Sequence, residues 1–284
     1  MVFHPAYKIK RREIMEHKKK NNNHNKRYNL LLSIFTAGFC ICCIIMLYQN
    51  YIQNMAEDRY EDLAAMNSEG VTESVTTTDT EEQELDLPVP EKEIDWDSLE
   101  QENSDIYAWI YIPNTQVDYP VLQNEENDNY YLDHNIDRSK GYPGAIYSQS
   151  VNQKDFSDVW TVLYGHNMGN GTMFGSLREF KDNEFFEENQ YIYIYTKERT
   201  FIYKIYSACT FGDQLLCDSY SFGLTVGVRQ FLAETAEVRD MSSHVRNDFD
   251  MPDDTKLLTL STCIKNSPDK RWLVNGVLLG SVRS

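Results

Sequence analysis

Apolar and polar side chains alternate in short runs along the chain after about residue 94, a pattern typical of β-strands buried on one face. Tyrosine is frequent, with 19 residues against four tryptophans, which favours half-buried strand faces. Turn-forming Pro, Gly and Asn residues separate the runs. The pattern predicts about eight strands, at residues 108–112, 117–122, 145–148, 158–164, 191–195, 200–207, 256–260 and 272–279.

Helical spacing is confined to a few short stretches of this region. A helix is expected at 96–103, where Asp95 can cap its N-terminus, and another at 225–238, where the apolar residues have near-helical spacing. Two more short helices are expected at 173–180 and 182–189. We therefore predict a mainly β domain with short helices, closed as a β-barrel or a rolled sheet. Pro120 indicates that the strand at 117–122 lies at an edge.

One uncharged stretch near the N-terminus differs from the rest of the chain. The 19 residues from Leu30 to Tyr48 carry no charge, and as a helix they span about 28 Å, close to the roughly 30 Å hydrocarbon core of a bilayer. All nine Lys and Arg of the first 51 residues precede this stretch, so the positive-inside rule predicts a cytoplasmic N-terminus. The alternative is a cleaved signal peptide, which the length of the apolar run and the absence of a clear small-x-small site disfavour.

The chain therefore divides into four predicted segments. They are a cytoplasmic basic segment at 1–29, a transmembrane helix at 30–48, an acidic flexible tether at 49–93 and a folded domain at 94–284. The tether begins with a possible helix at 54–66 and then becomes rich in Thr, Glu and Asp, with too few apolar residues to fold alone. Its expected role is to space an extracellular domain from the cell membrane.

The charge of the part beyond residue 51 argues against one class of partner. That part carries 18 basic and 42 acidic residues, a net charge of −24. Phosphate groups would be repelled by such a surface, so we expect no nucleic acid among its partners.

A cysteine and an arginine occupy the ends of two predicted neighbouring strands. Cys263 ends the strand that begins at about 256, and Arg271 begins the last strand, with a polar loop at 264–270 between them. If these strands pair, the thiol and the guanidinium face one cleft. Such a pair suits acyl transfer, because sulfur is a nucleophile and a permanent cation stabilises the oxyanion that its attack creates. The competing interpretations are a buried structural cysteine and a surface ion pair of Arg271 with Asp269.

His166 is the histidine best placed to serve this cysteine. The strand at 158–164 delivers it to a glycine-rich loop, whereas His4, His17 and His24 lie on the predicted cytoplasmic side and His134 and His244 lie in polar stretches. An imidazole can take the proton of a thiol and later protonate an amine leaving group. A loop histidine bonded to the backbone is the alternative.

The remaining cysteines and the loops do not indicate a cofactor. Cys40, Cys42 and Cys43 lie in the apolar span, and Cys209 and Cys217 either form a disulfide or, as we favour, stay reduced. His166 and the three later cysteines lack close metal-ligand spacing, and the 169–171 glycines do not make a phosphate loop. We expect neither a metal nor a cofactor.

These motifs resemble the sortase family. Thr259-Leu-Ser-Thr-Cys263 is similar to the family's TLxTC signature, and Leu163-Tyr-Gly-His166-Asn-Met resembles the histidine segment of the class B branch. So do residues 109–113, 117–121 and 130–132, and the long stretch at 210–256 fits the class B insertion. The resemblance covers about 94–284. The eight-residue spacing from Cys263 to Arg271 is short for class B, and Ile264 stands where relatives can have an acidic residue, so the preferred sorting motif stays open.

The resemblance implies an eight-stranded sortase barrel and a membrane-anchored transpeptidase of Gram-positive bacteria. It implies that Cys263 attacks the carbonyl of a Thr in an NPQTN-like C-terminal sorting signal, with His166 as acid and base and Arg271 holding substrate and oxyanion. Expected substrate-binding residues are Ser261, Leu132 and Ile264, the last through its backbone N–H. The implied partners are surface proteins bearing the signal and an amine acceptor, either peptidoglycan or a pilin lysine.

Three other functions compete with peptidoglycan anchoring. A pilus-type sortase would join pilin subunits, and a surface cysteine protease would release the acyl group to water. A surface adhesin with an idle barrel is the third, and the presence of Cys263, His166 and Arg271 together argues against it.

Overall fold

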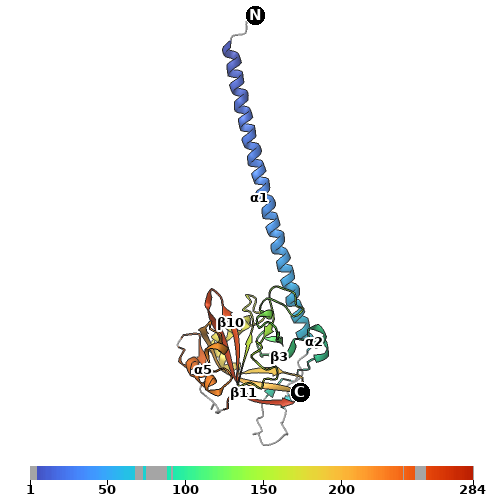
Figure 1. The fold of residues 1–284 in the computed structure, drawn as a ribbon, viewed down its shortest axis with the longest axis vertical. Helices are drawn as coiled ribbons and strands as arrows, with labels where there is room; N and C mark the ends of the chain where they lie inside the picture. Colours follow the sequence, from blue (N-terminus) through green and yellow to red (C-terminus); the bar gives the residue numbers. More distant parts are fainter. Residues whose placement is uncertain are drawn as a thin grey trace. The chain divides into compact units, whose positions relative to one another are not determined.

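A computed structural model describes residues 5–67, 73–74, 88–90, 92–238, 240–246 and 254–283. The chain forms two compact units, Met1–Asn54 and Met55–Ser284. Helix α1 (Pro5–Met66) forms the described part of the first unit, and its residues from Met55 onward belong to the second (Figure 1). Within the described chain, the part of this helix at Lys26–Met66 is long and apolar enough to cross a membrane.

The second unit is built on nine strands, eight of which close into a barrel. Going round the barrel, the order is β11-β10-β6-β5-β4-β3-β7-β8, and β8 then pairs with β11. This arrangement confirms the predicted eight-stranded β-barrel. The strands of the sheet are β3 (Ile106–Tyr111), β4 (Asp118–Leu122), β5 (Ile146–Tyr147), β6 (Trp160–Tyr164), β7 (Tyr191–Tyr195), β8 (Arg199–Gly212), β9 (His244–Val245), β10 (Leu257–Ile264) and β11 (Ser267–Arg283).

Short helices connect or cover these strands. Asp95 caps the first of them by accepting a hydrogen bond from the Ser98 amide, as the sequence predicts. A separate two-stranded sheet joins β1 (Glu73–Ser74) and β2 (Pro88–Val89). The helices are α2 (Trp96–Glu102), the 3₁₀ helices η1 (Tyr130–Leu132) and η2 (Gly175–Lys181), α3 (Asn183–Glu188), α4 (Leu216–Ser219) and α5 (Thr225–Glu237).

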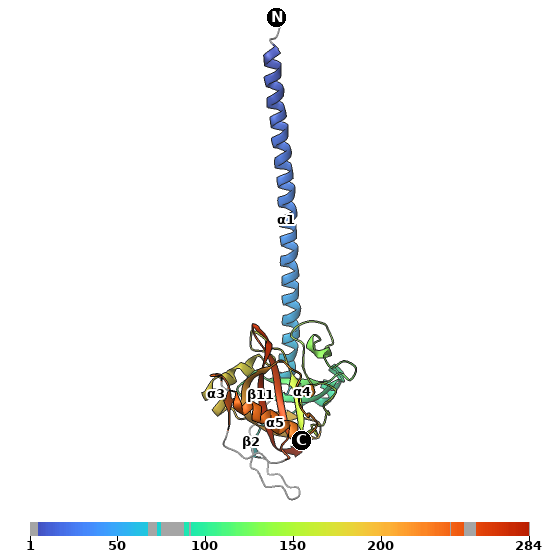
Figure 2. The same cartoon turned by 60° about the vertical axis from the view of Figure 1, so that its left-hand side comes forward.

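Alternating side chains of the barrel strands enter two different cores. Leu258 and Leu260 of β10 belong to the main core, whereas Leu257 belongs to a second core on the other face of the sheet. Successive side chains of a strand point to opposite faces, which explains the division. The second core is completed by Phe231 and Val228 of α5, which packs against β8 (Figures 1 and 2).

On the face of the sheet that carries the second core, hydrogen bonds between polar side chains fix the alignment of neighbouring strands. Thr259 of β10 accepts a hydrogen bond from Trp160 Nε1 at 3.0 Å and donates one to Asn275 Oδ1 at 2.8 Å. Asn275 in turn donates to Ser207 Oγ at 3.0 Å. The chain of bonds joins β6, β10, β11 and β8, and therefore holds the register of the strands that carry the site.

Two details of the strands differ from the sequence prediction. Pro120 does not mark an edge, because β4 lies between β3 and β5, but β5 pairs only with Val121 and Leu122 and so loses no bond at the proline. The predicted loop at 264–270 is a tight turn at residues 265–266. Residues 267–270 belong to β11 instead, where Ser267 pairs with Ile264 of β10 and Lys270 pairs with Gly212 of β8.

The last turns of α1 pack on the barrel unit. Tyr60 and Leu63 are buried there, and Asn67 accepts a hydrogen bond from the amide of Asp95. The prediction of a spacer at 49–93 did not include this contact. The acidic stretch of that segment lies mostly outside the described residues, so the division of the chain into segments at 1–29, 30–48, 49–93 and 94–284 stays a prediction.

Candidate active site

Cys263 and Arg271 lie directly opposite each other on paired strands. In the antiparallel β10–β11 pairing Cys263 is the partner of Arg271, and Ser261 is the partner of Leu273. Cys263 is exposed and Arg271 is half-buried. Both side chains lie on the face of the sheet that carries the second core, because Cys263 follows Leu257, and Arg271 precedes Leu273, at even spacing. The juxtaposition predicted from the two strand ends is therefore present.

The strand of Arg271 is irregular next to the cysteine. The register shifts after Cys263, so that Ile264 pairs with Ser267, and residues 268–270 have no partner on β10. Arg271 Nη1 donates to the carbonyl oxygens of Pro268 at 2.9 Å and Lys270 at 3.0 Å. These carbonyls belong to the irregular segment, which thus anchors one end of the guanidinium.

His166 reaches the same region from a neighbouring parallel strand. Strand β6 pairs with β10, with Tyr164 beside Ser261, so both chains run to the same rim of the barrel. Beyond the last pair the contacts continue: the Gly165 amide donates to Ser261 O at 3.2 Å, and Thr262 Oγ1 donates to Gly165 O at 2.7 Å. The rim loop is consequently fixed to the strand of Cys263.

The imidazole of His166 is held by a main-chain carbonyl. Its Nε2 lies 2.6 Å from the carbonyl oxygen of Leu132, at the end of η1. A carbonyl only accepts, so Nε2 carries a hydrogen and Nδ1 is the nitrogen left for proton exchange. The ring of Tyr142 lies 5.0 Å from the imidazole, centroid to centroid.

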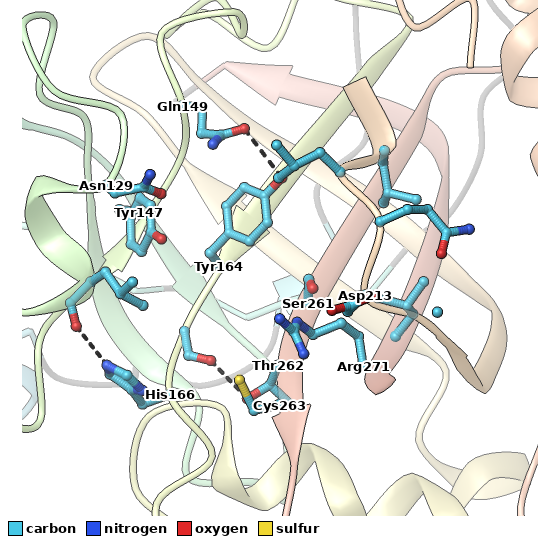
Figure 3. Close-up of a pocket in the computed structure, with 17 residues that line it drawn as sticks. Asn129, Tyr147, Gln149, Tyr164, His166, Asp213, Ser261, Thr262, Cys263 and Arg271 are labelled. Atoms are coloured by element: carbon cyan, nitrogen blue, oxygen red, sulfur yellow. Dashed lines mark hydrogen bonds between the residues drawn. The ribbon is translucent and has the colours of Figure 1, made fainter. Parts of the chain in front are cut away.

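All three side chains line one pocket (Figure 3). Figure 3 shows Cys263 between His166 and Arg271, with Tyr164 above and Ser261 behind. The two sides are formed by segments far apart in sequence, among them residues 129–132, 147–149 and 212–216. Leu132 and Ser261, which the sequence predicts as substrate-binding residues, belong to this lining. Ile264 is not among the lining residues and packs against the main core instead.

Two tyrosines that line the pocket, Tyr147 and Tyr164, carry neutral hydroxyls. The pKa of Tyr147 is raised by burial first and by the nearby Cys263 thiol second. Burial likewise raises the pKa of Tyr164, and Cys217 adds to that shift. The two rings are stacked at 5.5 Å, and Tyr164 donates to Gln149 Oε1 at 3.3 Å. The tyrosines therefore remain uncharged beside the cysteine at neutral pH.

Some residues in and next to the pocket were not expected from the sequence. Asn167 follows His166, and its Nδ2 donates to the carbonyl oxygen of Cys263 at 2.8 Å, which joins the two chemistry-bearing loops directly. The segment 212–216 enters the pocket because Gly212 pairs with Lys270 next to Arg271. Asn167 could have been identified from the sequence because it directly follows His166. The sequence of segment 212–216 contains no signal that would place it in the pocket.

The other cysteines stay apart from this chemistry. Cys209 and Cys217 are both free, Cys209 in the second core and Cys217 half-buried. Burial raises the pKa of the Cys209 thiol to about 12, which keeps it protonated and unreactive. Among the residues that the structure describes, no group of His, Cys, Asp and Glu is arranged to hold a metal ion.

Comparison with known proteins gives one consistent result. The model of the sortase domain family matches residues 110–279. Sortase B of Listeria monocytogenes is 31% identical over 186 residues, which cover 64% of this chain and 72% of that protein. The structure of Clostridium perfringens sortase B aligns with a TM-score of 0.57 and 29% identity, covering 65% of this chain and 99% of the other. A Streptococcus pyogenes class B sortase involved in pilus biogenesis aligns with a TM-score of 0.56 and 26% identity, over 65% and 98% of the two chains.

The family match spans more than half of the chain, and it includes the strands that carry Cys263, His166 and Arg271. The barrel topology and the pocket agree with it. The chain therefore belongs to the sortase family, in its class B branch, whose enzymes are transpeptidases that anchor or link surface proteins.

Proposed function

We propose that this sortase is a membrane-anchored cysteine transpeptidase, which cleaves a sorting signal after threonine and transfers the new carboxyl end to a peptidoglycan amine. The observation that carries the proposal is the opposition of Cys263 and Arg271 across β10 and β11, in a pocket that His166 also lines. A nucleophile, a fixed cation and an acid–base group then reach one substrate carbonyl.

The first half of the reaction forms a thioester. The thiol proton of Cys263 passes to Nδ1 of His166 as Sγ adds to the threonine carbonyl, and Arg271 donates hydrogen bonds to the resulting oxyanion. The C–N bond then breaks, and Nδ1 of His166 gives a proton to the leaving amine. Since Nε2 of His166 is engaged with the Leu132 carbonyl, that oxygen also stabilises the imidazolium between these steps.

The second half returns the enzyme to its starting state. The acceptor amine attacks the thioester carbonyl, and His166 takes the proton that the amine loses as the new amide forms. The thiolate of Cys263 leaves and takes this proton from His166. Both side chains then have the protonation with which they started. No cofactor enters this balance.

The pocket walls supply the substrate contacts of the proposal. Ser261 and Leu132 both line the pocket and are proposed to bind the signal peptide. The backbone N–H of Ile264 follows the cysteine directly and keeps its proposed role in the oxyanion hole. The signal is proposed to be of the NPQTN type, on the resemblance of the histidine and cysteine segments to class B enzymes.

Anchoring is proposed through the apolar part of α1. The stretch at 30–48 has the length of a membrane span, and the basic residues that precede it favour a cytoplasmic N-terminus. The barrel unit would then lie outside the cell, where surface proteins and peptidoglycan precursors are found.

Fluorescent five-residue sorting peptides test the proposal. The full chain in detergent is mixed with NPQTN-type and variant peptides, with and without a glycine oligomer or diaminopimelate, and products are identified by mass spectrometry. We expect a ligated product that depends on both the peptide and the amine. Cys263→Ala should give none, and cleavage retained in that variant would contradict the mechanism. Hydrolysis that no amine diverts would instead indicate a protease.

A pilus-type reaction is the second candidate. It is favoured by the similarity to a class B sortase of Streptococcus pyogenes that is involved in pilus biogenesis. The same assay distinguishes the two functions when a lysine-containing peptide is added as the acceptor. Ligation to the lysine side chain in preference to diaminopimelate would favour the pilus function.

A further inference from the structure

The last turns of α1 bury a tyrosine in the same compact unit as the barrel. This unit begins at Met55, and Tyr60 is only 2% exposed within its main core. The hydroxyl of Tyr60 donates to Gly144 O at 2.7 Å and accepts from Ile136 N at 3.0 Å. Both groups belong to the backbone of segment 133–145, which the tyrosine therefore fixes at two points.

That segment lies against the imidazole. Gly144 has a positive φ of 69°, and a Cβ on it would be 3.0 Å from Leu132 O and 3.3 Å from Cδ2 of His166. The Leu132 carbonyl is the group that accepts the hydrogen bond of Nε2 (Figure 3). Tyr142, two residues before Gly144, places its ring beside the imidazole. A shift of Gly144 would therefore move both the carbonyl and the ring that set the position of His166.

A second route leads from the same tyrosine to the other side of the histidine. The rings of Tyr60 and Tyr119 meet edge to face, with centroids 5.8 Å apart. The hydroxyl of Tyr119 accepts from Met173 N at 3.0 Å, and Met173 forms a β-bridge with Asn167, the neighbour of His166. Tyr60 thus contacts two groups, Gly144 and Tyr119, through which it is linked to both sides of the imidazole.

We propose that Tyr60 is a positioning residue for His166, through its hydroxyl bonds to Gly144 and Ile136 and its ring contact with Tyr119. The inference rests on the proposed acid–base role of His166 and extends it to the juxtamembrane end of α1. The segment that the sequence predicts as a spacer then forms part of the active-site scaffold.

Tyr60→Phe in the full chain, compared with Tyr195→Phe, tests this inference. Tyr195 is also buried, donates its hydroxyl hydrogen to Pro90 O at 3.1 Å and does not line the pocket. With peptide and amine as substrates, we expect Tyr60→Phe to lower kcat about tenfold, because the acid–base group loses its alignment. KM should change by less than about twofold, and the pH profile of kcat/KM should shift. Tyr195→Phe should match the wild type in all three quantities.

A measurement without turnover separates this inference from the proposed function. Proton–nitrogen correlation spectra of ¹⁵N-histidine-labelled enzyme, assigned with His166→Gln, report the ring tautomer directly. We expect one Nε2–H tautomer for His166 in the wild type and in Tyr195→Phe, and a mixture in Tyr60→Phe. If the wild type transfers no peptide, the proposed function fails, and the spectra still decide the position of the imidazole.

A second variant covers the case in which Tyr60→Phe does not fold. Tyr119→Phe leaves the hydroxyl of Tyr60 in place and removes only the bond to Met173 N. We expect a smaller change in the same His166 signals. A folded Tyr60→Phe enzyme with wild-type kcat, pH profile and tautomer would overturn the inference, as would an unchanged tautomer in Tyr119→Phe when Tyr60→Phe is unfolded.

Discussion

Thr259, four residues before Cys263, donates a hydrogen bond from its hydroxyl to the side-chain oxygen of Asn275 at 2.8 Å. The two residues are partners in the β10–β11 pairing, like Cys263 and Arg271. A slip of one residue between these strands would turn the cysteine and the arginine to opposite faces. The buried bond therefore serves the geometry of the active site as well as the stability of the barrel.

Thr259→Val should destabilise the enzyme without changing its size or apolar packing. Valine leaves Trp160 Nε1 without its acceptor and Asn275 Oδ1 without a donor, both fully buried. We expect a loss of about 1–3 kcal/mol in the free energy of unfolding. The measurement is urea unfolding of the full chain in detergent, followed by tryptophan fluorescence.

Thr235→Val is the matched control for this prediction. Thr235 is equally buried, but its hydroxyl bonds to the Leu232 carbonyl within its own helix, so less is left unpaired. We expect a loss below about 1 kcal/mol. Equal losses of unfolding free energy in the two variants would show that the hydrogen bonds across the strands stabilise the enzyme no more than a hydroxyl bonded within its own helix.

Arg271→Lys should remove most of the transpeptidase activity. The planar guanidinium bonds to two carbonyls of its own strand while other N–H groups remain for the oxyanion, and an ammonium cannot reproduce that fork. We expect kcat to fall about 100-fold. Arg199→Lys, at the far end of the β8–β11 pairing, is the control and should keep wild-type turnover. Near wild-type kcat in Arg271→Lys would show that any cation at this position is sufficient.

Asn167→Ala should slow the reaction by detaching the histidine loop from the cysteine. The lost bond joins Nδ2 to the Cys263 carbonyl at 2.8 Å. One such bond is worth about 1 kcal/mol, so kcat/KM should fall about fivefold to tenfold. Asn114→Ala, which breaks a bond to Asn189 outside the pocket, is the control. The prediction is wrong if both variants have the same kcat/KM.

The barrel could be predicted because its strands alternate apolar and polar residues, as in Leu257 to Ser261. The extent of β11 could not be predicted, since Pro268, Asp269 and Lys270 have poor strand propensity. They belong to the strand because Ser267 pairs with Ile264 on one side of them and Lys270 pairs with Gly212 on the other, and these contacts override local preference.

The candidate site was predictable to a similar degree. The spacing of two strand ends brought Cys263 and Arg271 together, and the strand at 158–164, which leads into a glycine-rich loop, singled out His166. The carbonyl of Leu132 that holds the imidazole could not be identified, because every residue has a carbonyl and only the folded loop shows which one is used. The buried Tyr60 was assigned to a spacer because the segment around it is rich in charge.

The stability of the barrel unit should fall at alkaline pH, in part because of Cys209. Burial raises the pKa of this thiol from 9.0 to about 12, so the folded state keeps it protonated while the unfolded state releases the proton. Its contribution is fully present below pH 9 and is lost as the pH rises toward 12.

Relative to a variant without the thiol, the wild type should lose about 1.4 kcal/mol of unfolding free energy by pH 10. Urea unfolding of Cys209→Ala and the wild type at pH 8 and pH 10 measures this, with Ile205→Val as a buried control that cannot titrate. The gap between wild type and Cys209→Ala should narrow with pH while the gap to Ile205→Val stays constant, and parallel curves for all three proteins would contradict the assignment.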